Sequence, residues 1–230
     1  MVIMKNHDFI SHSAIKKTAI KQRKAFSVRN MLCILFFGLA AVANIAKAAD
    51  VDVLAEKLVQ LSTFSGDFRQ TLVDDQGEVL QESTGVFFLE RPGYFSWETQ
   101  EPFPQLLVSD LTNIWLYDPD LEQVTVRPYD ERVSQTPALL LSGDVSKMSA
   151  SYEVVQTADN QFSLTPKNQQ ELFTQLIVEF VDGQLSAMSL QDSLGQTTTF
   201  AFLNGIYNQT IPSELFQFIP PEGTDVILGG

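Results

Sequence analysis

The feature that most constrains the fold is a series of short strand-like runs, separated by turn residues, that fills most of the chain from residue 66 onward. Apolar and polar residues alternate within these runs, as they do in strands with one buried face. Asp182-Gly183, between two such runs, is a strong hairpin signal. The predicted strands are residues 66–73, 78–90, 94–99, 105–109, 113–117, 122–127, 152–156, 162–165, 172–180, 184–191 and 196–203. About eleven closely spaced strands predict an antiparallel meander that forms one curved sheet or incomplete barrel, in a mainly β fold with some α-helix.

Two segments are predicted to be helical. In residues 50–61, four apolar residues share one face of an amphipathic helix: Val51, Leu54, Leu58 and Leu61. Residues 136–141 begin with Thr-Pro and continue Ala-Leu-Leu-Leu, which is typical of a short helix with Pro at its first position. Gly143 would end this second helix early. Two short helices can cover only part of a large sheet.

Aromatic residues are concentrated in the first half of the predicted sheet. They are Phe64, Phe68, Phe87, Phe88, Tyr94, Phe95, Trp97, Phe103, Trp115 and Tyr117. Aromatic residues favour strands, so the simplest interpretation is a packed core. A single curved sheet with little to cover it can instead enclose an apolar cavity. The pattern alone leaves both interpretations open.

Residues 1–48 have the order of a secretory signal peptide: basic residues, an apolar run at 31–42, and the cleavage signal Ala46-Lys47-Ala48. A membrane anchor is the alternative. As a helix, however, the apolar run would span roughly 18 Å, less than the bilayer core of about 30 Å. The residues before Cys33 are not the small ones of a lipoprotein leader. We therefore expect residues 49–230 to be a single exported domain.

Without residues 1–48 the chain is strongly acidic and has no Cys and no His. Seven basic and 27 acidic residues give residues 49–230 a formal net charge of −20. The absence of Cys and His removes disulfides, the commonest general base, the thiolate nucleophile and the usual zinc and copper ligands. The charge argues against a nucleic-acid partner, which would require Lys and Arg against phosphate. We expect no cofactor and no metal.

Two further alternatives use acidic residues. A glycosidase needs a pair of carboxylates roughly 5 to 9.5 Å apart, and no spacing in the sequence singles out such a pair. Asp118, Asp120 and Glu122 alternate as in a calcium loop, but the loop's glycine and its twelfth-position Glu are missing. Asp118-Pro119-Asp120 is more simply a turn.

Several segments, in order along the chain, match a known family: residues 61–70, 89–97, 107–110, 114–119, 121–126, 136–141, 162–166 and 218–224. The ordered set, behind a signal peptide, resembles the outer-membrane lipoprotein carrier (LolA) family. The resemblance implies an incomplete barrel with a helical lid over a hydrophobic cavity. It implies a monomeric periplasmic carrier and not an enzyme. Its partners would be acylated lipoproteins, an inner-membrane ABC transporter that releases them, and the outer-membrane receptor LolB.

A carrier of the same fold for another lipid or acylated ligand is the alternative. The receptor itself is disfavoured, because it is a lipoprotein and the chain lacks a lipid-attachment cysteine.

The resemblance also implies roles for individual residues. Arg91 would be a latch that bonds backbone groups of the lid helix, here Leu139, Leu140, Leu141 and Ser142. Alternation places Phe87, Leu89 and Arg91 on one strand face, so Arg91 would lie at the cavity rim. The expected cavity residues are Val51, Leu54, Leu58, Phe64, Phe68, Phe87, Leu89, Phe95, Trp97 and Trp115. Phe95 would also contact the transporter. The simpler interpretations are a turn arginine before Pro92 and ordinary core packing.

Overall fold

The computed structural model describes residues 50–129, 141, 148–168 and 173–229, all within the unit Val42–Gly230. The predicted signal peptide and most of the second predicted helix lie outside these residues. Residues 50–59 are helical, two residues fewer than predicted. Among the described residues, no helix is long and apolar enough to cross a membrane.

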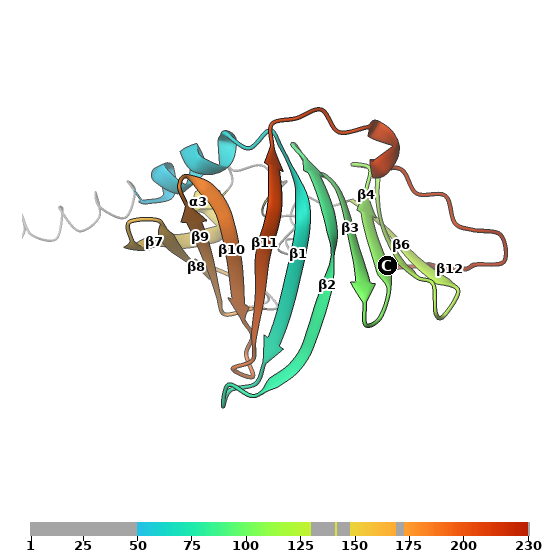
Figure 1. Cartoon of the computed structure of the whole chain (residues 1–230), viewed down its shortest axis with the longest axis horizontal. Helices are drawn as coiled ribbons and strands as arrows, with labels where there is room; N and C mark the ends of the chain where they lie inside the picture. The colour runs from blue at the N-terminus through green and yellow to red at the C-terminus, as the bar shows by residue number, and fades with distance from the viewer. Residues whose placement is uncertain (1–49, 130–140, 142–147, 169–172, 230) are drawn as a thin grey trace, which may run out of the picture. The chain divides into compact units, whose positions relative to one another are not determined.

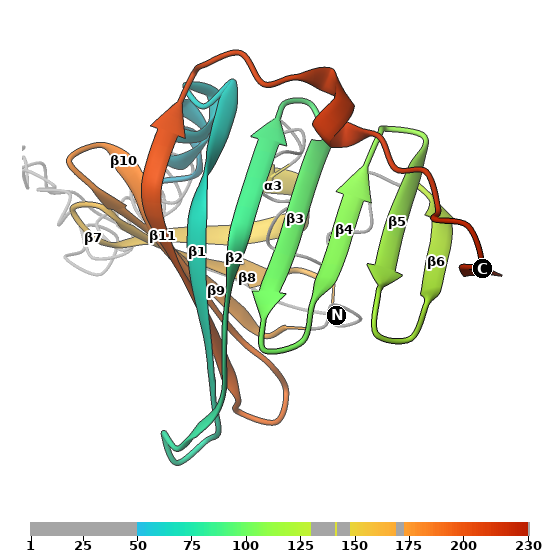
Figure 2. The same ribbon diagram turned by 45° about the vertical axis from the view of Figure 1, so that its right-hand side comes forward.

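The described residues form one curved, unclosed sheet of twelve strands, as the alternating pattern predicts (Figure 1, Figure 2). The strands are β1 (Thr63–Val73), β2 (Val79–Glu90), β3 (Tyr94–Glu101), β4 (Gln105–Ser109), β5 (Asn113–Asp118), β6 (Gln123–Pro128), β7 (Tyr152–Ala158), β8 (Gln161–Pro166), β9 (Gln175–Val181), β10 (Gln184–Gln191), β11 (Thr197–Tyr207) and β12 (Asp225–Leu228). Besides the helix of residues 50–59, two shorter helices accompany the sheet: α3 (Met148–Ser151) and the 3₁₀ helix η2 (Ser213–Phe216).

Two meanders make up the sheet, whose strand order is β12-β6-β5-β4-β3-β2-β1-β11-β10-β9-β8-β7. Strands β1 to β6 form one meander and β7 to β11 the other, and the antiparallel pairing of β1 with β11 joins them. Strand β12, which the sequence did not predict, adds to β6 in parallel. All four of its residues are exposed, so it lacks the alternation that reveals a strand.

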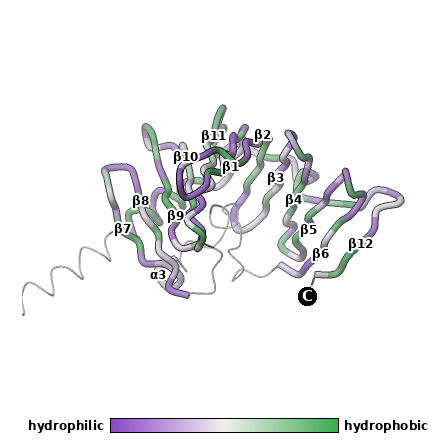
Figure 3. The backbone as a smooth tube through the Cα atoms, turned by 90° about the horizontal axis from the view of Figure 1, so that it is seen from below, coloured by the Kyte–Doolittle hydropathy of each residue, from purple (hydrophilic) through white to green (hydrophobic). Residues whose placement is uncertain are grey.

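The inner face of the sheet is apolar, and the helix of residues 50–59 packs against it. Cross-strand partners point to the same face, so the pairs Phe64–Leu89, Leu89–Phe95 and Phe87–Trp97 form continuous rows. Leu54 and Leu58 of the helix are fully buried in the same cluster. Figure 3 shows the sheet bending into an arch, seen roughly along the strands.

The C-terminal segment covers part of the outer face. After β11 the chain crosses to η2, where Phe216 is buried with its ring 5.6 Å from that of Tyr94 (Figure 1). Phe218 then lies 5.8 Å from the Trp115 ring and 5.4 Å from the Tyr117 ring. The chain ends in β12 at the edge of the sheet.

A glycine on the inner face allows the two central strands to pack tightly. Gly85 of β2 lies opposite Phe68 of β1, and the Phe68 ring occupies the space above it. A Cβ at Gly85 would lie 2.7 Å from the Phe68 ring and 1.9 Å from the carbonyl oxygen of Glu98. The Phe68 ring, placed in this way, packs 4.4 Å from the ring of Trp97.

Gly85→Ala is therefore expected to destabilise the fold, because the backbone of β3 and the Phe68 ring must both move to admit the methyl group. Overpacking of this kind costs about 1–3 kcal/mol in the free energy of unfolding. Urea denaturation would measure the loss. Gly229→Ala is the control, since its Cβ would meet its nearest neighbour at an ordinary 3.4 Å. Equal stability of the two variants would contradict this account.

Candidate functional site

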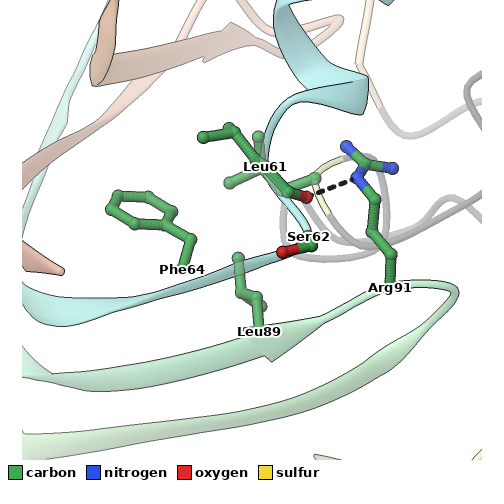
Figure 4. Close-up of a pocket in the computed structure, with 6 residues that line it drawn as sticks. Leu61, Ser62, Phe64, Leu89 and Arg91 are labelled. Carbon is green, nitrogen blue, oxygen red and sulfur yellow. Dashed lines mark hydrogen bonds between the residues drawn. The ribbon is translucent and has the colours of Figure 1, made fainter. Parts of the chain in front are cut away.

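The candidate site is the rim where the helix of residues 50–59 meets the inner face of the sheet. A small pocket there is lined by Leu61, Ser62, Phe64, Leu89, Arg91 and Leu141 (Figure 4). Alternation along β2 directs Phe87 and Leu89 inward and continues to Arg91, the residue after the strand. The rim thus joins a charged side chain to an otherwise apolar surface.

Arg91 is tied to the segment that leaves the helix. Its Nε donates a hydrogen bond to the carbonyl oxygen of Leu61 at 3.0 Å (Figure 4). Its backbone N–H donates to the carbonyl oxygen of Ser62, also at 3.0 Å. Leu61 lies just beyond the helix, in the short segment that leads to β1. A permanently charged guanidinium with five N–H donors is well suited to bond a backbone carbonyl there.

This arrangement revises the predicted latch. Arg91 lies at the rim as expected, and Leu141 lines the same pocket. Among the described residues, however, the Arg91 side chain bonds to Leu61, a partner that was not predicted from the sequence. Leu139, Leu140 and Ser142 lie outside the described residues, so their bonding to Arg91 stays a prediction. The pairing of Thr63 with Glu90 brings Leu61 beside Arg91, and that register is not visible in the sequence.

Polar contacts also hold the helix against the other end of the sheet. The Asp50 carboxylate accepts the backbone N–H of Gln156, in edge strand β7, at 3.0 Å. Lys57 Nζ donates to Asn160 Oδ1 at 3.3 Å and lies 5.2 Å from the centre of the Phe180 ring. The helix is therefore fastened near β7 and β9 by these residues and beside β2 by Arg91.

Nine of the ten predicted cavity residues come together in one cluster. They are Val51, Leu54, Leu58, Phe64, Phe68, Phe87, Leu89, Phe95 and Trp97. Their aromatic rings contact one another closely, for example Phe64 with Phe87 at 4.7 Å and Phe87 with Trp97 at 5.5 Å. The cluster forms a continuous apolar surface between the sheet and the helix.

The prediction that Trp115 lines the cavity is wrong. Trp115 pairs with Val108 and Val126, while its neighbour Ile114 belongs to the inner cluster. Successive side chains of a strand point to opposite faces, so Trp115 lies on the outer face. There it packs against Phe218. The aromatic content of β5 did not reveal which phase of the alternation faces inward.

Phe95 is 0% exposed, with Leu89 beside it on one strand and Ser109 on the next. Another protein could contact this ring only after the covering residues move. A role for Phe95 in partner contact therefore requires a conformation other than the one described.

The carboxylate of Asp118, one of the three considered for calcium, bonds within a turn and to the neighbouring strand. Asp118 Oδ1 accepts the backbone N–H of Leu121 at 3.1 Å, and Oδ2 accepts a bond from Gln105 Nε2 at 3.3 Å. In the part of the chain that the structure describes, no group of three or more Cys, His, Asp or Glu is arranged to hold a metal ion.

Tyr207 closes the row of aromatic side chains at the rim. Its ring stacks on Phe64 at 4.6 Å, and its hydroxyl donates to the carbonyl oxygen of Leu185 at 3.0 Å. Burial raises the pKa of the Tyr207 hydroxyl above its ordinary value of 10.0, because the phenolate would be poorly solvated there.

Tyr207 should therefore make the free energy of unfolding fall at high pH. Its neutral form is favoured in the folded state, so its contribution is complete below about pH 10 and is lost as the pH rises through the folded-state pKa. Urea titrations of wild type and Tyr207→Phe would measure this. The stability difference between them should shrink above about pH 10. A difference that does not change with pH would contradict the expectation.

Comparisons with known proteins find one named family over most of the chain. The family model described as "Outer membrane lipoprotein carrier protein LolA" matches residues 59–219. An outer-membrane lipoprotein carrier protein of Hahella chejuensis is 45% identical over 194 residues, which cover 82% of this chain and 93% of that protein. One from Azotobacter vinelandii is 44% identical over 197 residues, covering 82% and 95%. A solved LolA superfamily protein from Nitrosomonas europaea has a TM-score of 0.44 at 9% identity, covering 74% of this chain and 98% of that one. Both of these sequence relatives are named as carrier proteins.

Proposed function

The chain belongs to the outer-membrane lipoprotein carrier (LolA) family, and on this premise we propose that it shuttles acylated lipoproteins across the periplasm. It accepts them from an inner-membrane ABC transporter, shields their acyl chains against the inner face of the sheet, and delivers them to an outer-membrane receptor. The observation that carries this proposal is the apolar, aromatic-lined inner face, closed at its rim by a helix that Arg91 ties to the sheet.

A carrier must release its cargo, so closure and binding have to be close in free energy. A hydrogen bond from a charged group such as Arg91 contributes about 1.5–3 kcal/mol. Burying one CH₂ group contributes about 0.8 kcal/mol. Roughly two to four buried methylenes would therefore offset the bond from Arg91 to Leu61. An acyl chain has enough methylenes to displace the helix, and the latch then favours reclosure when the chain leaves.

Opening of the rim would also expose Phe95, the residue predicted to contact the transporter. Phe95 is fully buried in the closed conformation and belongs to the same row as Leu89. Movement of the helix and of Leu141 away from the rim would uncover both side chains. We propose that the transporter contacts Phe95 in this open conformation, which would couple loading to displacement of the lid.

The test is a release assay with Arg91→Leu beside the wild type. Inner-membrane vesicles that hold labelled lipoproteins are mixed with the purified mature chain and ATP, and the soluble complex is then offered to outer membranes. Wild type should release and deliver the lipoprotein. Arg91→Leu should release it but deliver at least about tenfold less, because the free energy that favours reclosure, about 1.5–3 kcal/mol, is lost.

The matched control is Arg69→Leu, since Arg69 is an exposed arginine on neighbouring strand β1. It should behave as wild type in both steps. A wild-type chain that binds a fluorescent fatty acid but releases no lipoprotein would favour a carrier for another lipid. A chain that does neither would overturn the proposed function.

A further inference from the structure

One polar group interrupts the apolar inner face close to the rim. Ser109, the last residue of β4, lies opposite Phe95 of β3 and opposite Ile114 of β5. Both partners belong to the inner cluster, so the Ser109 side chain points to the same face. The row Phe64, Leu89, Phe95, Ser109 and Ile114 is thus apolar except at Ser109.

The Ser109 hydroxyl is buried without a hydrogen-bond partner among the described residues. Ser109 is 0% exposed, and no polar group of the described part of the chain lies within hydrogen-bond reach of its Oγ. Other buried serines differ from it: Ser83 Oγ accepts from Gln81 Nε2 at 3.0 Å, and Ser163 Oγ accepts from Gln175 Nε2 at 2.8 Å. A buried hydroxyl without a partner destabilises a protein, so an apolar residue at position 109 would suit the closed conformation better.

We propose that the Ser109 hydroxyl is a ligand-binding group that donates a hydrogen bond to the acyl carbonyl oxygen of the bound lipid. The inference rests on the proposed function. An acyl chain is apolar except at its carbonyl, and an ester or amide carbonyl oxygen is an acceptor that requires a donor once it leaves water.

Position supports this assignment. Arg91 follows Leu89 at the rim, and Ser109 lies in the row of Leu89, so the hydroxyl lies one row inside the opening. A chain that enters methyl end first carries its carbonyl last, at about this depth. Ser109 then fixes how far the chain is inserted and distinguishes an acyl chain from a plain hydrocarbon.

Three ligands of equal chain length test the inference: the methyl ester of a fatty acid, its N-methyl amide, and the methyl ether of the corresponding fatty alcohol. Each competes against a fluorescent fatty acid for the mature chain. Wild type should bind the ligands that have a carbonyl about five- to tenfold more tightly than the ether, as one added hydrogen bond predicts. If the preference is limited to the ester or to the amide, that ligand identifies which kind of carbonyl Ser109 binds.

Ser109→Ala should bind all three ligands with nearly the affinity of wild type for the ether. The empty variant should be at least as stable as wild type in urea, because the unpartnered hydroxyl is removed. Ser96→Ala is the matched control: Ser96 is also buried, at 8% exposed, but pairs with Val108 on the outer face. It should keep the preference for a carbonyl.

Three results would overturn the inference. If Ser109→Ala keeps the carbonyl preference of wild type, the hydroxyl does not bind the carbonyl, although the proposed function stands. If Ser109→Ala is strongly destabilised, the hydroxyl has a structural partner. If wild type binds none of the three ligands, the inference falls, and the proposed function falls with it only if the release assay also fails.

Discussion

The antiparallel pairing of β1 with β11 is the contact on which the rest of the structure depends. It places Phe68 opposite Phe202 and Phe64 opposite Tyr207. These residues come from the first strand of one meander and the last strand of the other. Each meander alone would leave an apolar face in water. Once β1 and β11 join them, the two faces become one continuous concave surface that a single helix can partly close.

Because that surface is apolar, a few hydrogen bonds are enough to determine where the helix of residues 50–59 lies on it. The helix of residues 50–59 buries Leu54 and Leu58 fully in the apolar cluster, and such burial does not by itself fix the orientation of the helix. The position of the helix on the sheet is set by three hydrogen bonds. The Asp50 carboxylate bonds to β7, Lys57 bonds to Asn160, and Arg91 bonds to the carbonyl oxygen of Leu61. A cover held by apolar burial and a few directed bonds can be displaced by a ligand that supplies apolar surface of its own.

The strands of the two meanders could be predicted because each has one buried face and therefore alternates. The bounds of β4 and β10 agree with the prediction, and those of most others differ at the ends by a few residues. β12 could not be predicted, because it is four residues long, wholly exposed and paired in parallel with a distant strand. Trp115 was placed on the wrong face because alternation shows that a strand has two faces but not which one turns inward. The face to which Trp115 points depends on its contacts with Val108 and Phe218, which lie in other segments of the chain.

The sequence by itself determined the mainly β meander, the acidic composition without Cys or His after residue 48, the family, and most of the side chains that gather inside the sheet. These follow from local periodicity, composition and ordered motifs, which need no knowledge of distant contacts. The tertiary structure alone decided that Arg91 bonds to Leu61, that Phe95 is fully buried next to the rim, and that the hydroxyl of Ser109 has no hydrogen-bond partner among the described residues. Each of these depends on the register between strands. Register is set by how whole faces pack together, so it cannot be read from any one segment of the chain.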